Sequence, residues 1–160
     1  PVYRAENIVD ELYAEIVANV SLITSDFEII LVEDGSPDNS WSKIVDICGA
    51  DKRVKGIKLS RNFGQHYAIT VGLQKSSGNW VVVMDCDLQD QPEEIPKLYS
   101  KANEGYDIVF GKRTNRKDSF FKKLRSDVYF ALYNYLTENN TDSRVSNFSI
   151  ISKKVLIALD

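Results

Sequence analysis

The 160-residue sequence lacks several features that mark common classes of protein. Its two cysteines, Cys48 and Cys86, have no metal-type or disulfide-type spacing, so we expect thiols in a reducing compartment. No apolar run approaches the roughly 18 residues that a membrane span needs. The net charge of −3 argues against nucleic-acid binding over the whole surface, because such domains are basic. We therefore expect a cytoplasmic protein. Any anionic ligand would be bound by a local group of residues and not by the surface as a whole.

The apolar content of the chain, 43%, is enough for the core of one domain. The sequence opens on Pro1 and stops at Asp160, directly after an apolar segment. We expect it to be a piece of a longer protein, so a membrane anchor elsewhere remains compatible with it.

Helical and strand-like patterns alternate along the chain. We predict helices over residues 6–20, 41–49, 65–76 and 92–103, and strands over residues 27–32, 54–60, 79–85 and 106–113. This alternation predicts an α/β fold with a Rossmann-like, mainly parallel sheet and helices on both faces. Such sheets bind ligands at the carboxyl ends of their strands, where the clusters EDGS, SRNFG, DCDLQD and GKRT all fall.

The stretch VVVMDCDLQDQPEEIP, residues 81–96, places acidic residues directly after an apolar strand. On extended backbone, side chains two apart point the same way, so Asp85 and Asp87 can converge with Gln89 on a Mg²⁺ or Mn²⁺ ion. Two aspartates at this spacing are common by chance, and a solvated turn or a helix cap is the alternative. Their position at a strand end favours the metal site.

The segment EDGSPDNS, residues 33–40, has two interpretations. A turn followed by a helix cap accounts for Gly35, Pro37 and Asp38. It gives no reason for Glu33 and Asp34 at the strand tip, where a carboxylate could accept hydrogen bonds from a nucleobase or a ribose. The local sequence leaves both interpretations open.

A basic segment begins near residue 112. Residues 112–125 hold seven Lys or Arg and one Asp, a net charge of +6 that leaves −9 on the rest of the chain. The predicted helix that follows carries an apolar stripe up to Leu136. We expect peripheral membrane contact through residues 112–136; a solvated face, or packing within the domain, explains the same pattern.

In combination, five ordered segments resemble family 2 inverting glycosyltransferases, of the polyprenyl-phosphate sugar transferase and the O-antigen or capsule type: PVYRAEN, VEDGSPDNS, LSRNFGQHYAITVGL, VVVMDCDLQDQPEEIP and YDIVFGKR. The resemblance implies a GT-A type nucleotide-diphospho-sugar transferase fold. It implies a single catalytic domain over 1–160, with a nucleotide- and metal-binding part over 1–113 and an acceptor-side or membrane-facing part over 114–160. The implied reaction is metal-dependent transfer of a sugar from a nucleoside diphosphate sugar to a polyprenyl phosphate or a growing cell-surface glycan.

The resemblance also implies roles on the donor side of the site. Pro1 and Tyr3 match positions that flank the nucleobase, and Asp34 matches the carboxylate that hydrogen-bonds the base. Asp85 matches the first acid of the metal motif, which is directed at the ribose or the metal. These four residues are therefore expected to bind the nucleotide.

Further matched residues concern the diphosphate. Asp87 and Gln89 match metal and diphosphate positions, Arg113 matches a basic residue near the diphosphate, and Arg125 is its expected partner. The chemistry agrees with this set, because a leaving nucleoside diphosphate accumulates negative charge that a divalent ion and arginine stabilise.

Two departures from the family pattern affect the expected site. Arg4 stands where the family usually has Asn, and Asn147 stands where many relatives carry an acid. Asn cannot accept a proton as a carboxylate does. If the acceptor is an ionised lipid phosphate, no general base is needed and Asn147 would orient it. If the acceptor is a sugar hydroxyl, Asp90 or Asp142 must act as the general base. Capping of the helix that follows explains the presence of Asp90 equally well.

Other functions compete with sugar transfer. A sugar-nucleotide nucleotidyltransferase would need a Gly-rich basic loop, which PVYRAEN lacks. A phosphorylated signalling domain would use Lys112 and Thr114, but it leaves the base-side motifs unexplained. A non-catalytic nucleotide-binding module of the same fold stays compatible with Asn147.

Overall fold

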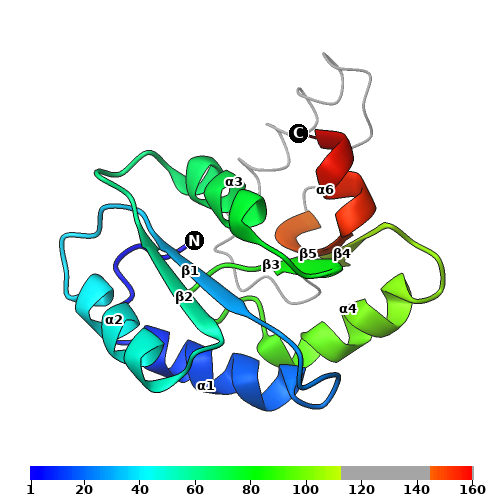
Figure 1. Ribbon diagram of the computed structural model, residues 1–160, viewed down its shortest axis with the longest axis horizontal. Coiled ribbons are helices and arrows are strands. Elements are labelled where there is room, and N and C mark those ends of the chain that lie inside the picture. The colour runs from blue at the N-terminus through cyan, green and yellow to red at the C-terminus, as the bar shows by residue number, and fades with distance from the viewer. Residues whose placement is uncertain (113–144, 160) are drawn as a thin grey trace, which may run out of the picture.

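The computed structural model describes residues 1–112 and 145–159, and helices and strands alternate through them (Figure 1). The elements are α1 Val9–Val20, β1 Ile29–Glu33, α2 Ser40–Ala50, β2 Val54–Lys58, α3 Gln65–Lys75, β3 Trp80–Val83, the 3₁₀ turn η1 Pro92–Glu94, α4 Ile95–Ala102, β4 Ile108–Lys112, β5 Val145–Ser152 and α6 Lys153–Leu159. The helices and strands expected within the described residues all occur, with boundaries shifted by up to three residues. The helix expected toward Leu136 lies outside the described residues. The expected α/β class is confirmed.

The strands of the described residues form two groups. β1 and β2 pair in parallel, from Ile29 opposite Val54 to Glu33 opposite Lys58. β5 lies between β3 and β4 and is antiparallel to both. No strand was expected over 145–152, because serines and Asn147 separate its apolar residues and no continuous apolar run marks it. The described strands therefore form one parallel pair and one antiparallel group of three, where a single, mainly parallel sheet was expected.

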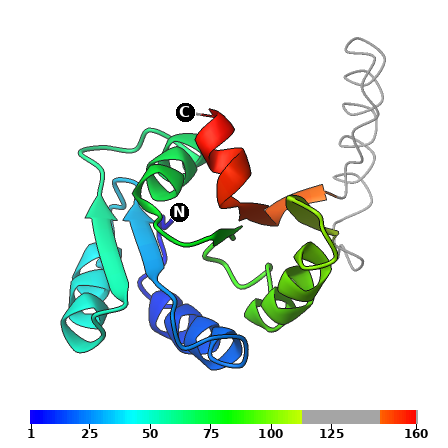
Figure 2. The ribbon, with the colours of Figure 1, turned by 45° about the vertical axis from the view of Figure 1, so that its right-hand side comes forward.

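Helices cover both sides of the strands, as the sequence predicted. In the two ribbon views α1, α2 and α4 lie on one side, and α3 and α6 lie on the other (Figures 1 and 2). The strand β1 is buried between these layers, since Ile29, Leu31 and Val32 are each at most 6% exposed. Such a strand needs apolar residues on both faces, which explains its near-continuous apolar sequence.

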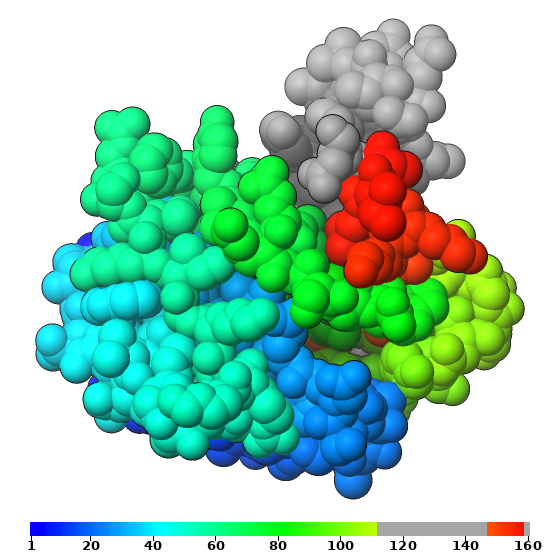
Figure 3. Space-filling view, viewed as in Figure 1, coloured from blue at the N-terminus to red at the C-terminus, as the bar shows by residue number. Residues whose placement is uncertain are grey.

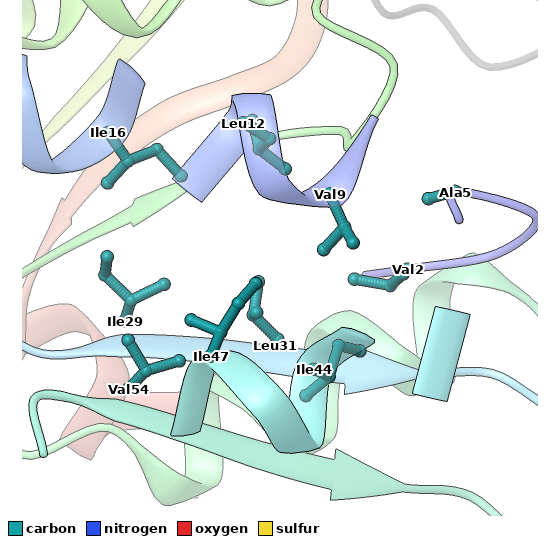
Figure 4. Packing of buried hydrophobic residues seen from close by; sticks show 10 residues of the cluster. All are labelled: Val2, Ala5, Val9, Leu12, Ile16, Ile29, Leu31, Ile44, Ile47 and Val54. Carbon is teal, nitrogen blue, oxygen red and sulfur yellow. The ribbon is translucent and has the colours of Figure 1, made fainter. Parts of the chain in front are cut away.

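The main core joins α1 and α2 to the first two strands (Figure 4). Val9, Leu12 and Ile16 are the buried residues of α1, and their spacing of three and four places them on one helix face. They pack with Ile29, Leu31, Ile44, Ile47 and Val54. Full burial of each such side chain contributes about 1.5–3 kcal/mol. The packing fixes the position of β1 and of the acidic residues at its end.

A second core joins α4 to the antiparallel strand group. Ile95, Leu98 and Ala102 of α4 pack against Phe148 and Ile150 of β5. This contact holds η1 and α4 beside the strand β3 that precedes the acidic stretch. Among residues 1–112 and 145–159, no helix has the length and apolar character that crossing a membrane requires.

Candidate functional site

The site begins with a contact between the ends of β1 and β2. Asp34, directly after β1, is 3% exposed. Its Oδ1 accepts the backbone N–H of Phe63 at 2.7 Å and its Oδ2 accepts the backbone N–H of Gly64 at 2.9 Å. One buried carboxylate therefore holds the RNFG loop that follows β2.

The same loop reaches the acidic stretch after β3. Gly64 has a φ of 97°, which turns the chain into α3, and Gln65 is the first residue of that helix. The side-chain amide of Gln65 donates a hydrogen bond to Oδ1 of Asp85. The carboxyl ends of β1, β2 and β3 are thus joined through side chains at one rim.

The acidic stretch forms a turn held by its own side chains. Asp90 is 2% exposed, and its Oδ2 accepts the backbone N–H of Asp85 at 3.1 Å. Asp87 Oδ1 accepts the backbone N–H of Gln89 at 3.0 Å. Between them Leu88 adopts a positive φ of 58°. The turn leaves the side chains of Asp87 and Gln89 exposed at the rim and buries Asp90 behind Asp85.

This position shows what Asp90 does in the structure. Its carboxylate fixes the backbone of Asp85, so it is a positioning residue for the acidic turn. Its role as a general base stays a prediction, and so does the base-binding role of Asp34, whose oxygens hold the RNFG loop.

The residues at the rim can be compared with the needs of a divalent cation. Within the part of the chain that the structure describes, no group of three His, Cys, Asp or Glu side chains could hold a metal ion. Asp85 and Asp87 supply two carboxylates and Gln89 an amide oxygen. Mg²⁺ usually takes one or two carboxylates and completes its shell with water and substrate phosphates. The donor set fits such an ion and does not form a closed all-protein site, so the expected metal stays a prediction.

The N-terminal residues lie beside both acidic clusters. Burial lowers the pKa of the α-amino group of Pro1, against the opposing effect of Cys86, Asp85 and Asp34 nearby. Tyr3 is 41% exposed, and the guanidinium of Arg4 lies 5.4 Å from its ring centroid. The expected base-side residues are therefore close to the rim, with an aromatic face available to solvent.

The segment EDGSPDNS anchors these N-terminal residues. The hydroxyl of Ser36 accepts the backbone N–H of Arg4 at 2.9 Å, and the buried hydroxyl of Ser40 accepts that of Ala5 at 2.8 Å. Asp38 accepts the backbone N–H of Ser40, the first residue of α2, at 3.2 Å. The structure shows the expected turn, whose Asp38 holds the first backbone N–H of α2. The turn also positions Tyr3.

The acceptor side is described only in part. β5 pairs Ser149 with Val83, the last residue of β3, and Asn147 lies two residues before Ser149 on β5. The side chain of Asn147 is exposed. Arg113, Arg125 and Asp142 lie outside the described residues, as does the membrane contact expected over 112–136 apart from Lys112.

One polar residue of the site was not expected from the sequence, and the hydrogen-bond partners of another were not. Gln65 follows the RNFG motif directly, and a polar residue at the start of that helix was the available signal. Glu33 is fully buried; its Oε1 accepts the backbone N–H of Ser36, while Oε2 has no hydrogen-bond partner among the described residues. The acid pair at the strand tip was noted, but its partners lie on a turn whose geometry the sequence does not give.

Comparison with known proteins gives a consistent result. The model of glycosyl transferase family 2 matches residues 1–159. An undecaprenyl-phosphate 4-deoxy-4-formamido-L-arabinose transferase of Proteus mirabilis is 41% identical over 133 residues, which are 82% of this chain and 41% of that protein. The protein of the same name from Enterobacter sp. strain 638 is 39% identical over 149 residues, 92% of this chain and 44% of that protein.

Two further similarities concern length and fold. An uncharacterised glycosyltransferase of Bacillus subtilis, YkcC, is 36% identical over 156 residues, 97% of this chain and 48% of that protein. The chain thus spans less than half the length of these three relatives. The crystal structure of TarS from S. aureus superposes with a TM-score of 0.57 at 21% identity, over 75% of this chain and 22% of that one. At that identity the likeness concerns the fold alone.

Proposed function

Because the chain belongs to glycosyl transferase family 2, we propose that it forms the donor-binding part of an enzyme that transfers a sugar from a nucleoside diphosphate sugar to a polyprenyl phosphate. Two of the similar proteins are named as undecaprenyl-phosphate sugar transferases, which supports a lipid phosphate as acceptor. The chain spans less than half the length of those proteins, so the reaction is proposed for the whole protein that contains it.

One observation carries the proposal. Asp34 binds the backbone of Phe63 and Gly64, and the next residue, Gln65, binds Asp85. The three strand ends are thereby fixed relative to one another, at the edge where open α/β sheets bind nucleotides. A preorganised rim costs less to order when the ligand binds.

Each residue at the rim then has a chemical task. Tyr3 offers an aromatic face for the nucleobase. Asp85, Asp87 and Gln89 would hold a Mg²⁺ or Mn²⁺ ion, which supplies positive charge next to the diphosphate. An ionised lipid phosphate is already a nucleophile, so Asn147 can orient it without removing a proton. This assignment accounts for the amide side chain of Asn147 at a position where many family members carry an acid.

The proposal is tested by binding of nucleoside diphosphates with and without Mn²⁺, measured by calorimetry and by the EPR signal of free Mn²⁺. We expect Mn²⁺ alone to bind weakly and Mn²⁺ with nucleotide to bind tightly, because two carboxylates leave coordination positions for phosphate oxygens. Asp87→Asn should remove the Mn²⁺-dependent part of nucleotide binding. The matched control is Asp46→Asn, an exposed aspartate on α2.

Equal Mn²⁺-dependent binding by both variants would overturn the assignment of the rim. Transfer is tested separately, with a labelled nucleotide sugar and either a polyprenyl phosphate or a glycan acceptor. Transfer only to a glycan hydroxyl would contradict the role given to Asn147, since that reaction needs a base.

A further inference from the structure

Tyr3 and Arg4 form an exposed turn between two buried residues. Val2 is 2% exposed and Ala5 is 1% exposed. Val2 pairs with the end of β1 through its backbone, and the backbone N–H of Ala5 donates to the buried hydroxyl of Ser40. Because both flanking residues are fixed, the two residues between them turn outward within a short space, and both side chains are exposed.

This turn holds Arg4 in an unfavourable backbone conformation. Its φ is 52°, in the left-handed region that few residues other than glycine, Asn and Asp adopt readily. Among the described residues only one other non-glycine residue has a positive φ, Leu88 in the acidic turn. Strained backbone of this kind clusters at binding sites and active sites. Both strained residues of the described chain thus belong to the same rim.

The backbone gives no reason for an arginine at this position. Asn adopts a positive φ several-fold more readily, and it is the residue that the family pattern has here. The bond to the hydroxyl of Ser36 uses only the backbone N–H of Arg4, which every residue except proline could supply. The reason for the arginine therefore lies in its side chain.

The guanidinium of Arg4 has an aromatic neighbour and unused donors. It lies 5.4 Å from the ring centroid of Tyr3. Among residues 1–112 and 145–159 it makes no ion pair, and the only hydrogen bond of Arg4 to a side chain is that of its backbone N–H. A guanidinium has five N–H donors and no acceptor, and an exposed contact between a cation and a ring is weak. The pair therefore presents one aromatic ring together with several hydrogen-bond donors.

The buried acid next to this pair already has partners. Each carboxylate oxygen of Asp34 accepts a backbone N–H of the RNFG loop, and the residue is 3% exposed. A base that stacks on the ring of Tyr3 would therefore meet the donors of Arg4 more readily than the acceptors of Asp34. Hydrogen bonding then requires acceptors on the edge of the base that faces Arg4.

We propose that Arg4 is a specificity-determining residue, which selects a nucleotide whose base carries a carbonyl oxygen on the edge away from the ribose. Uracil has O4 there and guanine has O6, whereas cytosine and adenine have an amino group that would face the donors of Arg4. The base takes the place of the guanidinium on the ring of Tyr3, and the guanidinium moves to the edge of the base. The inference rests on the proposed function, because it requires that the rim binds a nucleotide.

The test compares nucleotides that differ at this edge of the base. UDP and CDP carry a carbonyl or an amino group at position 4 of the pyrimidine, and inosine diphosphate and ADP carry them at position 6 of the purine. Calorimetry with Mn²⁺ should show that the parent chain binds the carbonyl member of one pair at least about tenfold more tightly, since a hydrogen bond to a charged group is gained. The pair that shows the preference identifies the base as a pyrimidine or a purine.

Arg4→Asn is the variant that tests the residue. It should bring the two affinities of that pair to within about twofold of each other, mainly by weakening the carbonyl member. The urea midpoint of unfolding should stay the same or rise, because Asn tolerates the positive φ. A purely structural role of Arg4 would give the opposite result, a lower midpoint with the preference retained.

The matched control is Arg61→Asn. Arg61 is also exposed, and its guanidinium also lies over a ring, 4.8 Å from the centroid of Phe63. It belongs to the loop between β2 and α3, which stands out from the surface in the space-filling view (Figure 3). The substitution removes the same charge, so it measures the general effect of charge on nucleotide affinity. It should leave the preference within the pair unchanged.

The outcomes separate this inference from the proposed function. If the parent chain binds all four nucleotides alike, or if Arg4→Asn keeps the preference, Arg4 does not select the base and the proposed function stands. Equal loss of the preference in Arg4→Asn and Arg61→Asn would likewise overturn the specific role of Arg4. If the parent chain binds none of the four nucleotides, the proposed function is wrong and the inference falls with it.

Discussion

The side-chain amide of Gln65 donates a hydrogen bond to the carboxylate of Asp85, although the two residues are 20 positions apart. Gln65 begins the helix after β2, and Asp85 begins the acidic turn after β3. The bond orients a carboxylate that also has its backbone N–H held by Asp90. Asp85 is thus fixed from two elements before any ligand arrives.

The first prediction concerns this bond. Gln65→Leu should weaken binding of a nucleoside diphosphate with Mn²⁺ about tenfold, since one hydrogen bond to a charged group is lost. Gln65 is exposed, so the free energy of unfolding should change little. Gln74→Leu, at an exposed position near the far end of the same helix, should leave binding unchanged. Calorimetry of all three proteins measures the difference, and equal affinities would show that Gln65 does not orient the site.

The second prediction concerns the close approach of two loops at Gly35. This residue has a φ of 64°, and a Cβ there would overlap the backbone nitrogen of Asn62 and the carbonyl carbon of Arg61. Gly35→Ala should therefore lower the free energy of unfolding by about 2 kcal/mol or more, because strained backbone and steric overlap add. Urea unfolding measures the change.

The control for Gly35 is another glycine in open space. A Cβ at Gly49, in the last turn of α2, meets nothing within 4 Å. Gly49→Ala should be neutral or stabilise the protein by up to about 1 kcal/mol, since alanine favours helix. Equal destabilisation by both substitutions would mean that the contact between residue 35 and the RNFG loop is not the cause.

The third prediction is a pH dependence at Asp51, far from the rim. Its carboxylate accepts hydrogen bonds from the guanidinium of Arg53 at 2.7 Å and from the hydroxyl of Tyr13 at 2.9 Å. These bonds, with that of Arg53 first, hold the pKa of Asp51 well below its ordinary value. A lowered folded-state pKa stabilises the protein fully above the unfolded pKa of about 3.9, and this stabilisation is lost as the pH falls below it.

Asp51→Asn should therefore lower the urea midpoint at pH 7, and the difference from the parent chain should shrink as the pH approaches 2.5. Asp46→Asn is the control, since Asp46 is an exposed residue of α2, and it should give no such trend. A constant difference between the parent and Asp51→Asn across this range would contradict the lowered pKa as its source.

The sequence predicted much of the fold because the signals are local. The spacing of Val9, Leu12 and Ile16 predicts the buried face of α1, and the apolar runs before Asp34 and Asp85 predict β1 and β3. The same patterns place the acidic residues at strand ends. The resemblance to family 2 glycosyltransferases, confirmed by the family match, rests on these local segments and their order.

Strand pairing and the contacts of the site were decided only by the tertiary structure. Nothing in residues 145–152 says that β5 lies between β3 and β4, and nothing in EDGS says that Asp34 binds the backbone of Phe63. A local pattern reports which face of an element is apolar, whereas pairing and positioning depend on packing between segments far apart in the chain.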